Sequence, residues 1–161
     1  TSTDKVSVFA GVRKLSDAAT SVVAELSATV DGNTGAFRLT APTSGGHAYQ
    51  YISRGSTAQL AAANATNLVA PHSAVISAKS DINADISSLR INGLLKGTSA
   101  SDQGTGNYGN SPLYIGRRAG TSLPFYGHIY GLIGIGKLTS DSETAAIEKE
   151  LAKRTGVTLS V

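Results

Sequence analysis

The chain of 161 residues is 40% hydrophobic and 16% charged, and it contains no Cys, which excludes disulfide bonds and thiolate metal sites. Its length suits one domain with a substantial core, and no apolar run approaches the ~20 residues of a membrane helix, so we expect no membrane insertion. The formal net charge is +3, but the basic residues are scattered rather than gathered on one face, so we expect no nucleic-acid partner.

The first part of the sequence predicts antiparallel strands. Over residues 5–15 apolar side chains recur at every second position, which is typical of a strand. Residues 21–30 repeat this pattern, and a turn at 31–35 leads into a strand at 36–40, so the two predict a hairpin. Further strands are predicted at residues 47–54, 69–78, 85–91, 94–98, 113–117 and 125–138.

Two other segments differ in how clearly they can be interpreted. Asn92 and Gly93 predict a tight hairpin turn, because a type I′ turn needs positive φ at both central positions. The Ala-rich residues 57–67 are compatible with a helix and equally with a long loop or short turn.

One helix is predicted at the end of the sequence. Ser140 and Glu143 form a capping box, basic residues occupy the last turn, and Gly156 is placed to end the helix. The sequence therefore predicts an all-β fold, an antiparallel β-sandwich (jelly roll) with one short C-terminal α-helix. We expect residues 1–161 to form a single domain of a longer chain, because the sequence begins at Thr1 rather than Met.

Three segments carry a resemblance to a known family. Residues 89–95 (LRINGLL), 112–118 (PLYIGRR) and 125–133 (FYGHIYGLI) resemble segments of concanavalin A-like lectin/glucanase domains, also called laminin-G-like domains. Residues 108–125 are similar to such domains in tail proteins of bacteriophages and prophages. The resemblance implies a concanavalin A-like fold, a location in the virion (tail) or at a cell surface, and binding of host-surface carbohydrate or assembly of the tail.

Catalytic residues are not expected. The hydrolases of this fold use closely spaced carboxylates on one strand, whereas Glu25 is the only Glu on a predicted strand and the other three lie on the predicted helix. The three His residues have no metal-ligand spacing. We expect that the protein is not an enzyme.

Two groups of residues are candidates for carbohydrate binding, which uses an aromatic face with amides and charges around it. One lies on a predicted strand and the other in a Gly-rich loop followed by two basic residues; they comprise His47, Tyr49, Tyr51, Arg54, Asn107, Tyr108, Asn110, Arg117 and Arg118. The alternative for Tyr49 and Tyr51 is that their rings cover the core with the hydroxyls outward, and a place in the core is an alternative for Tyr108 as well.

A calcium site is also considered. Asp81, Asn83 and Asp85 place three oxygen donors at alternate positions, as acidic loops do in some laminin-G-like domains. The alternative is that the three side chains lie along a solvated strand edge. No other cofactor is expected.

The leading hypothesis is a non-catalytic recognition module, a domain of a phage-type tail protein that binds host cell-surface carbohydrate. The first alternative is a purely structural module that contacts other virion subunits or forms a homo-oligomer. The second is a glycan-cleaving enzyme.

Overall fold

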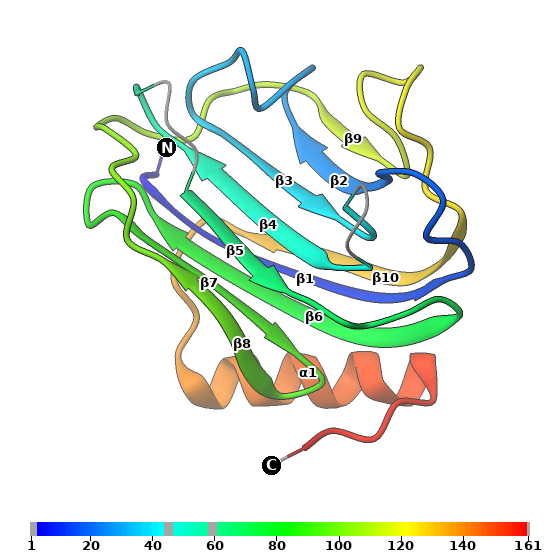
Figure 1. Ribbon diagram of the computed structural model, residues 1–161. Helices are drawn as coiled ribbons and strands as arrows, with labels where there is room; N and C mark the ends of the chain where they lie inside the picture. The colour runs from blue at the N-terminus through cyan, green and yellow to red at the C-terminus, as the bar shows by residue number, and fades with distance from the viewer. Residues whose placement is uncertain (1–2, 44–46, 58–60, 161) are drawn as a thin grey trace.

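Ten strands form two antiparallel sheets in the computed structural model, which describes residues 3–43, 47–57 and 61–160, with the backbone alone at 61–63 (Figure 1). The first sheet has the order β10 (Gly127–Ile135), β1 (Lys5–Lys14), β6 (His72–Asp81), β7 (Ile86–Ile91) and β8 (Leu94–Ser99). The second sheet has the order β5 (Ala61–Ala65), β4 (Tyr49–Arg54), β3 (Ala36–Thr40), β2 (Val22–Leu26) and β9 (Leu113–Ile115). One helix, α1 (Asp141–Thr155), follows the strands. The predicted jelly-roll sandwich with a C-terminal helix is confirmed.

The local signals in the sequence are confirmed. Asn92 and Gly93 both have positive φ, 52° and 87°, and join β7 to β8. Ser140 and Glu143 form the predicted capping box, and Gly156 ends α1 in the left-handed conformation. The strand predicted over 21–30 is shorter, because Ser27 has a φ of 88° and starts a loop.

The Ala-rich region, for which the sequence was compatible with a helix or a loop, forms part of a strand. Residues 61–65 are β5 and pair with β4, whereas 58–60 lie outside the described residues. The backbone of β5 lies close to β8: a Cβ on Gly97 would lie 2.3 Å from the carbonyl oxygen of Asn64. Both interpretations of 61–65 were therefore wrong, because pairing with β4 sets the conformation of this segment rather than local preference.

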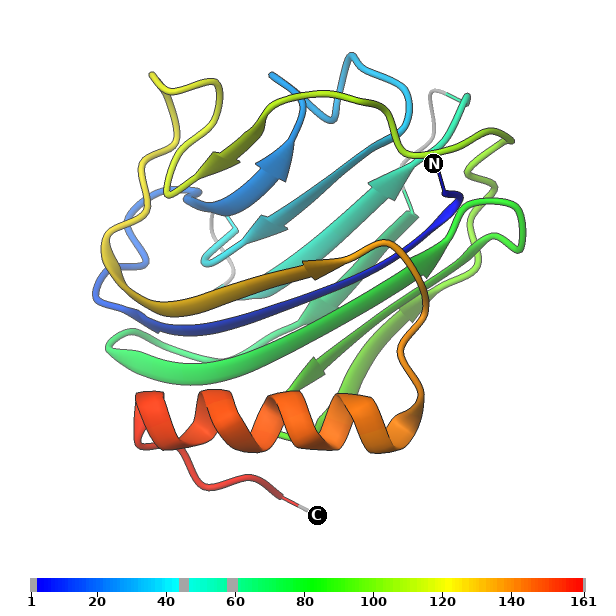
Figure 2. The same ribbon diagram turned by 180° about the vertical axis from the view of Figure 1, so that it is seen from behind.

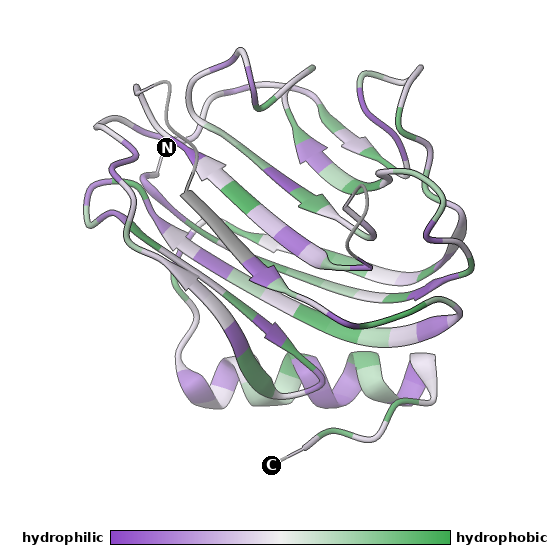
Figure 3. Cartoon of the chain, viewed as in Figure 1, coloured by the Kyte–Doolittle hydropathy of each residue, from purple (hydrophilic) through white to green (hydrophobic). Residues whose placement is uncertain are grey.

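The main core lies between the two sheets. Alternate residues of the strands face inward, and their apolar side chains include Val8, Val12, Leu39, Ile76 and Leu89. Figure 3 shows the resulting alternation of hydrophobic and hydrophilic residues along the strands of the second sheet.

A second apolar layer lies between the first sheet and α1. Phe9 and Val75 point away from the main core and pack against Leu151 and Ala152 of the helix. Gly11 allows this close contact, since a Cβ there would lie 2.8 Å from the Thr155 side chain. The central strand β1 is therefore covered on both faces, which explains why it is buried almost continuously.

The outer face of the second sheet is different. Within the described residues α1 is the only helix, and it lies against the first sheet, so no helix covers this face (Figures 1 and 2). Nor is any helix in this part of the chain both long and apolar enough to cross a membrane.

Candidate functional site

The register of the second sheet gathers polar side chains in rows on its outer face. Residues directly opposite each other in an antiparallel pair point to the same side. Glu25 pairs with Tyr114 on one side and with Arg38 on the other, and Thr40 pairs with Gln50. Because Phe37 and Leu39 face the core, Arg38 between them faces outward.

Glu25 forms the floor of this face. Its side chain is 0% exposed, yet it carries a carboxylate that is held by a bidentate ion pair with Arg118. Nε of Arg118 lies 3.0 Å from Oε2 of Glu25, and Nη2 lies 3.1 Å from Oε1. The backbone N–H of Val30 also donates to Oε1 at 2.7 Å. These bonds offset the cost of burying the carboxylate and hold Arg118 in place.

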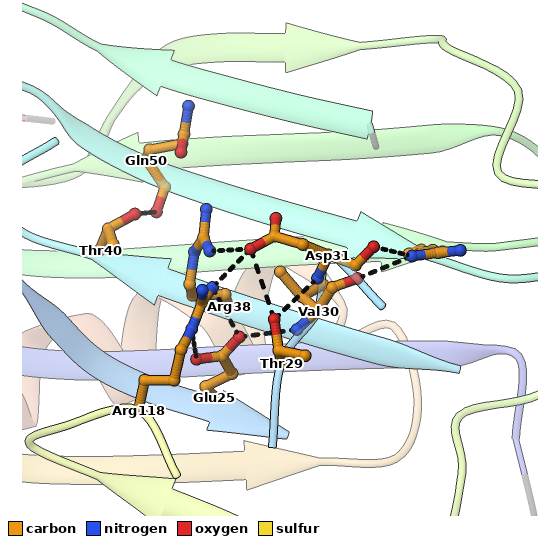
Figure 4. Close-up of polar contacts among 9 residues, drawn as sticks. Glu25, Thr29, Val30, Asp31, Arg38, Thr40, Gln50 and Arg118 are labelled. Carbon is orange, nitrogen blue, oxygen red and sulfur yellow. Dashed lines mark hydrogen bonds and ion pairs between the residues drawn. The ribbon is translucent and has the colours of Figure 1, made fainter. Parts of the chain in front are cut away.

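Asp31 is the exposed member of the same cluster, with 48% of its side chain exposed, whereas the side chains of Arg38 and Arg118 are mostly buried. Oδ2 of Asp31 lies 2.8 Å from Nη2 of Arg118 and 3.2 Å from Nη1 of Arg38. Figure 4 shows one oxygen of the Asp31 carboxylate in contact with both guanidinium groups. We call Glu25, Asp31, Arg38 and Arg118 the arginine cluster.

The charges of the cluster are matched. Burial by itself would lower the pKa of Arg118, but the bonds to Glu25 and the charge of Asp31 outweigh burial and raise the pKa. The Arg118 guanidinium therefore stays charged, and in the cluster two arginines face two carboxylates. Chemically, such a pair of guanidinium groups on an open sheet face suits a bidentate anionic ligand, above all a carboxylate.

Uncharged polar side chains extend this face. Thr40 donates to the carbonyl oxygen of Gln50 at 3.2 Å, and the Gln50 amide donates to Asn64 at 2.8 Å. Tyr114, half-buried beside Glu25, adds the one aromatic ring of the row. Hydroxyls, amides and an aromatic ring next to a charged pair are groups that sugars commonly contact.

Two of the predicted carbohydrate-binding residues face the core instead. Tyr49 and Tyr51 are buried between the sheets, and their hydroxyls bond to His72 and Ser80. Their rings are therefore closed to a sugar. The alternative that they cover the core is correct for the rings, but the hydroxyls point to partners inside the protein rather than outward. Desolvation raises the pKa of both phenols, so they stay neutral.

The predicted loop site also differs from expectation. Tyr108 is not an exposed ring: it is buried, and its hydroxyl bonds to Ser53 and Ser80. Asn107 and Asn110 on either side are exposed. The error arose because a Gly-rich loop does not reveal which of its side chains closes the core.

The remaining predicted carbohydrate-binding residues do not form one site. His47 is exposed and pairs with Asp17, whose other oxygen binds the buried Lys14. Arg54 is buried and donates to backbone carbonyls rather than presenting its charge. Arg117 is exposed and donates to the carbonyl oxygen of Gly120, so among the nine, within the described part of the chain, Arg118 is the one that joins the cluster as a charged partner.

The candidate calcium ligands do not converge. Asp81 pairs with Lys5, Asn83 donates to Asp4, and Asp85 accepts the backbone N–H of Gln103. Within the ranges described above, no group of three or more His, Asp or Glu side chains could hold a metal ion. Protein partners thus use carboxylate oxygens of Asp81 and Asp85 that would bind calcium.

Searches with the whole chain show which proteins share this architecture. No family model matches the sequence, and no curated protein matches it. Among solved structures, the IT-sialidase CBM40 of Ruminococcus gnavus bound to α2,3-sialyllactose matches with a TM-score of 0.67 and 19% identity, over 91% of this chain and 83% of that one. Its complex with α2,6-sialyllactose matches with a TM-score of 0.67 and 20% identity, over 91% and 84%.

The sandwich has the fold of the CBM40 domains. A heptameric SAP-like pentraxin from Limulus polyphemus matches as well, with a TM-score of 0.66 and 8% identity over 91% of this chain and 70% of that one. The neighbours thus include a second lectin-type jelly roll, in agreement with the concanavalin A-like fold that the sequence resembles.

Sequence reasoning missed most of the polar outer face of the second sheet. It placed Glu25 on a strand, but Arg38 and Tyr114 were not singled out. A signal was present, since each is a polar residue or Tyr flanked by two apolar residues in a strand. What the pattern did not contain was the pairing of β2 with β9, which brings Arg118 to Glu25 across 93 positions.

Proposed function

We propose that the protein is a non-catalytic glycan-binding module that uses the outer face of its second sheet to bind a carboxylate-bearing sugar. The observation that carries this proposal is the convergence of Arg38 and Arg118 on one exposed point. Two guanidinium groups fixed from different segments of the chain provide a bidentate site for a carboxylate at little cost in side-chain entropy.

The structural neighbours support the same class of ligand. Two of them are CBM40 structures with α2,3- and α2,6-sialyllactose bound, and sialic acid carries a carboxylate. The half-buried Gln50 amide beside the cluster supplies a polar group for the hydroxyls of a sugar, and Tyr114 supplies a ring. A hydrolytic role fits the cluster poorly, because Glu25 is fully buried and ion-paired and so cannot donate a proton to a glycosidic oxygen.

The test compares α2,3-sialyllactose with lactose by isothermal titration calorimetry. We expect saturable binding of the sialylated sugar and none of lactose. Arg38→Ala should lower the affinity at least about tenfold, as the loss of one charge-assisted hydrogen bond predicts. Arg117→Ala is the matched control, because it removes an exposed arginine that follows β9 and bonds to the carbonyl oxygen of Gly120 rather than to the cluster.

Each outcome has a clear meaning. If Arg117→Ala weakens binding as much as Arg38→Ala, general positive charge rather than the cluster binds the sugar. If neither sialyllactose nor other carboxylated glycans bind, the proposal is wrong, and the structural role in an assembly becomes the better hypothesis.

The biological setting is a further part of the proposal. We propose that this module is displayed on a virion tail or another extracellular surface, where it would meet host glycans and neighbouring subunits. The support is the resemblance of residues 108–125 to phage tail domains. Immunogold labelling of purified virions with an antibody to the module would test the location.

A further inference from the structure

We propose that Asp31 is an internal stand-in for the ligand carboxylate, which an incoming sugar must displace from the two arginines. This inference rests on the proposed function and concerns how the same site selects its ligand. Asp31 Oδ2 accepts from both Arg38 and Arg118 at 3.2 and 2.8 Å, which is the position that a bound carboxylate would take.

The two carboxylates of the cluster differ in whether they can leave. The Glu25 side chain is 0% exposed and bound on both oxygens, so it is a fixed part of the floor. The Asp31 side chain is 48% exposed and lies at the surface of the cluster. An exposed ion pair contributes little net stability, so exchange of Asp31 for another carboxylate costs little.

The backbone around Asp31 is held, so only its side chain has to move. Arg54 donates through Nη1 to the carbonyl oxygens of Val30, at 3.2 Å, and of Asp31, at 2.5 Å. The N–H of Val30 bonds to Glu25, and the Val30 side chain packs with Ala36 and Ile52 in a small buried cluster. Rotation of the Asp31 side chain therefore opens the site without opening the loop.

Arg38 is left only partly satisfied by Asp31. Its Nη1 donates to Asp31, whereas its buried Nε has no hydrogen-bond partner within the described structure. A buried donor without a partner favours any rearrangement that supplies one. A ligand with two carboxylate oxygens can engage both arginines more fully than the single oxygen of Asp31.

Asp31 would act as a filter for charge. With Asp31 present the cluster holds two positive and two negative side chains, so a neutral sugar gains nothing from the arginines. A carboxylated sugar can replace Asp31. The hydrogen bonds that the sugar forms with the arginines then offset those that Asp31 loses. The site therefore favours anionic sugars through competition rather than through a free positive charge.

The experiment measures the affinity for α2,3-sialyllactose of the wild-type chain, Asp31→Asn and Glu150→Gln by isothermal titration calorimetry. Asp31→Asn keeps the size and the backbone and removes the competing charge, so we expect binding to tighten about three- to tenfold. Glu150→Gln is the matched control, since it removes one negative charge from an exposed acid of α1, which packs on the other sheet. It should leave the affinity unchanged.

The results separate this inference from the proposed function. If the wild type binds and Asp31→Asn binds equally or more weakly, Asp31 orients the arginines instead of competing, and the inference is overturned while the proposed function stands. If both acid replacements tighten binding to the same extent, long-range charge explains the effect and the inference is also overturned. If neither the wild type nor Asp31→Asn binds, the proposed function fails and this inference with it.

Discussion

The two sheets have outer faces of opposite chemistry. The outer face of the first sheet is apolar at Phe9 and Val75, and α1 covers it. The outer face of the second sheet carries the row of Glu25, Arg38 and Tyr114, and the described chain places no helix on it. An apolar face needs a cover to leave water, whereas a row of paired charges can stay open to solvent and to a ligand.

Because the two outer faces differ in this way, stability and ligand binding should depend on different residues. Residues that pack α1 onto the first sheet should affect stability and leave binding unchanged. Residues of the arginine cluster should affect binding, and Glu25 should affect both, because it is the buried floor of the open face. Three variants test this division, beginning with the one expected to have the largest effect.

Glu25→Gln should be the most destabilising. It leaves Arg118 without its buried counter-charge, and breaking such a pair costs about 3 kcal/mol of the free energy of unfolding. Urea denaturation followed by circular dichroism measures the change, with the exposed Glu150→Gln as control. A loss below about 1 kcal/mol would mean that Asp31 compensates for the missing charge, and that the floor of the open face is less essential than its burial indicates.

Leu151→Ala should rank second in its effect on stability. Leu151 is 2% exposed between α1 and the first sheet, and truncation of such a residue costs about 2–3 kcal/mol. The affinity for sialyllactose should not change, since the site lies on the other sheet. If affinity falls together with stability, the two outer faces are coupled and the proposed division between them is wrong.

The smallest effect concerns pH and the start of α1. The side-chain bond from Lys137, followed by the backbone N–H of Ser140, lowers the pKa of Glu143 from 4.5 to about 2. A carboxylate whose pKa is lowered by folding stabilises the fold above the unfolded pKa, and this contribution disappears as the pH falls from about 4.5 to about 2.

Glu143→Gln tests this pH dependence. The variant should unfold at a lower temperature than the wild type at pH 6, and the difference should vanish near pH 2. Thermal denaturation between pH 2 and pH 6 measures it. A difference that persists at pH 2 would assign the effect to packing rather than to charge.

Much of the fold could be predicted from the sequence because its signals are local. Alternation with a period of two marks a strand wherever one face is buried, and Asn92–Gly93 specifies a turn through its own φ angles. The capping box of Ser140 and Glu143 needs only one helical turn to form. These features depend on neighbours a few residues away, so the amino-acid sequence alone determined them.

The tertiary structure decided which side of each strand is the core. Tyr49 and Tyr51 share a face in any strand, but only the packing of the two sheets turns that face inward. Tyr108 is buried because Ser53 and Ser80, far away in the sequence, meet its hydroxyl. Alternation shows that two residues point the same way, and it contains nothing about what lies on that side.

The candidate site depended on tertiary structure most of all. The Arg117–Arg118 pair was evident in the sequence, but only Arg118 reaches Glu25, which is 93 positions away. Asp31 joins them because Arg54 and Glu25 hold the backbone of its loop. Contacts across such separations arise from strand order and register, and these are set by how the whole core packs rather than by any local preference.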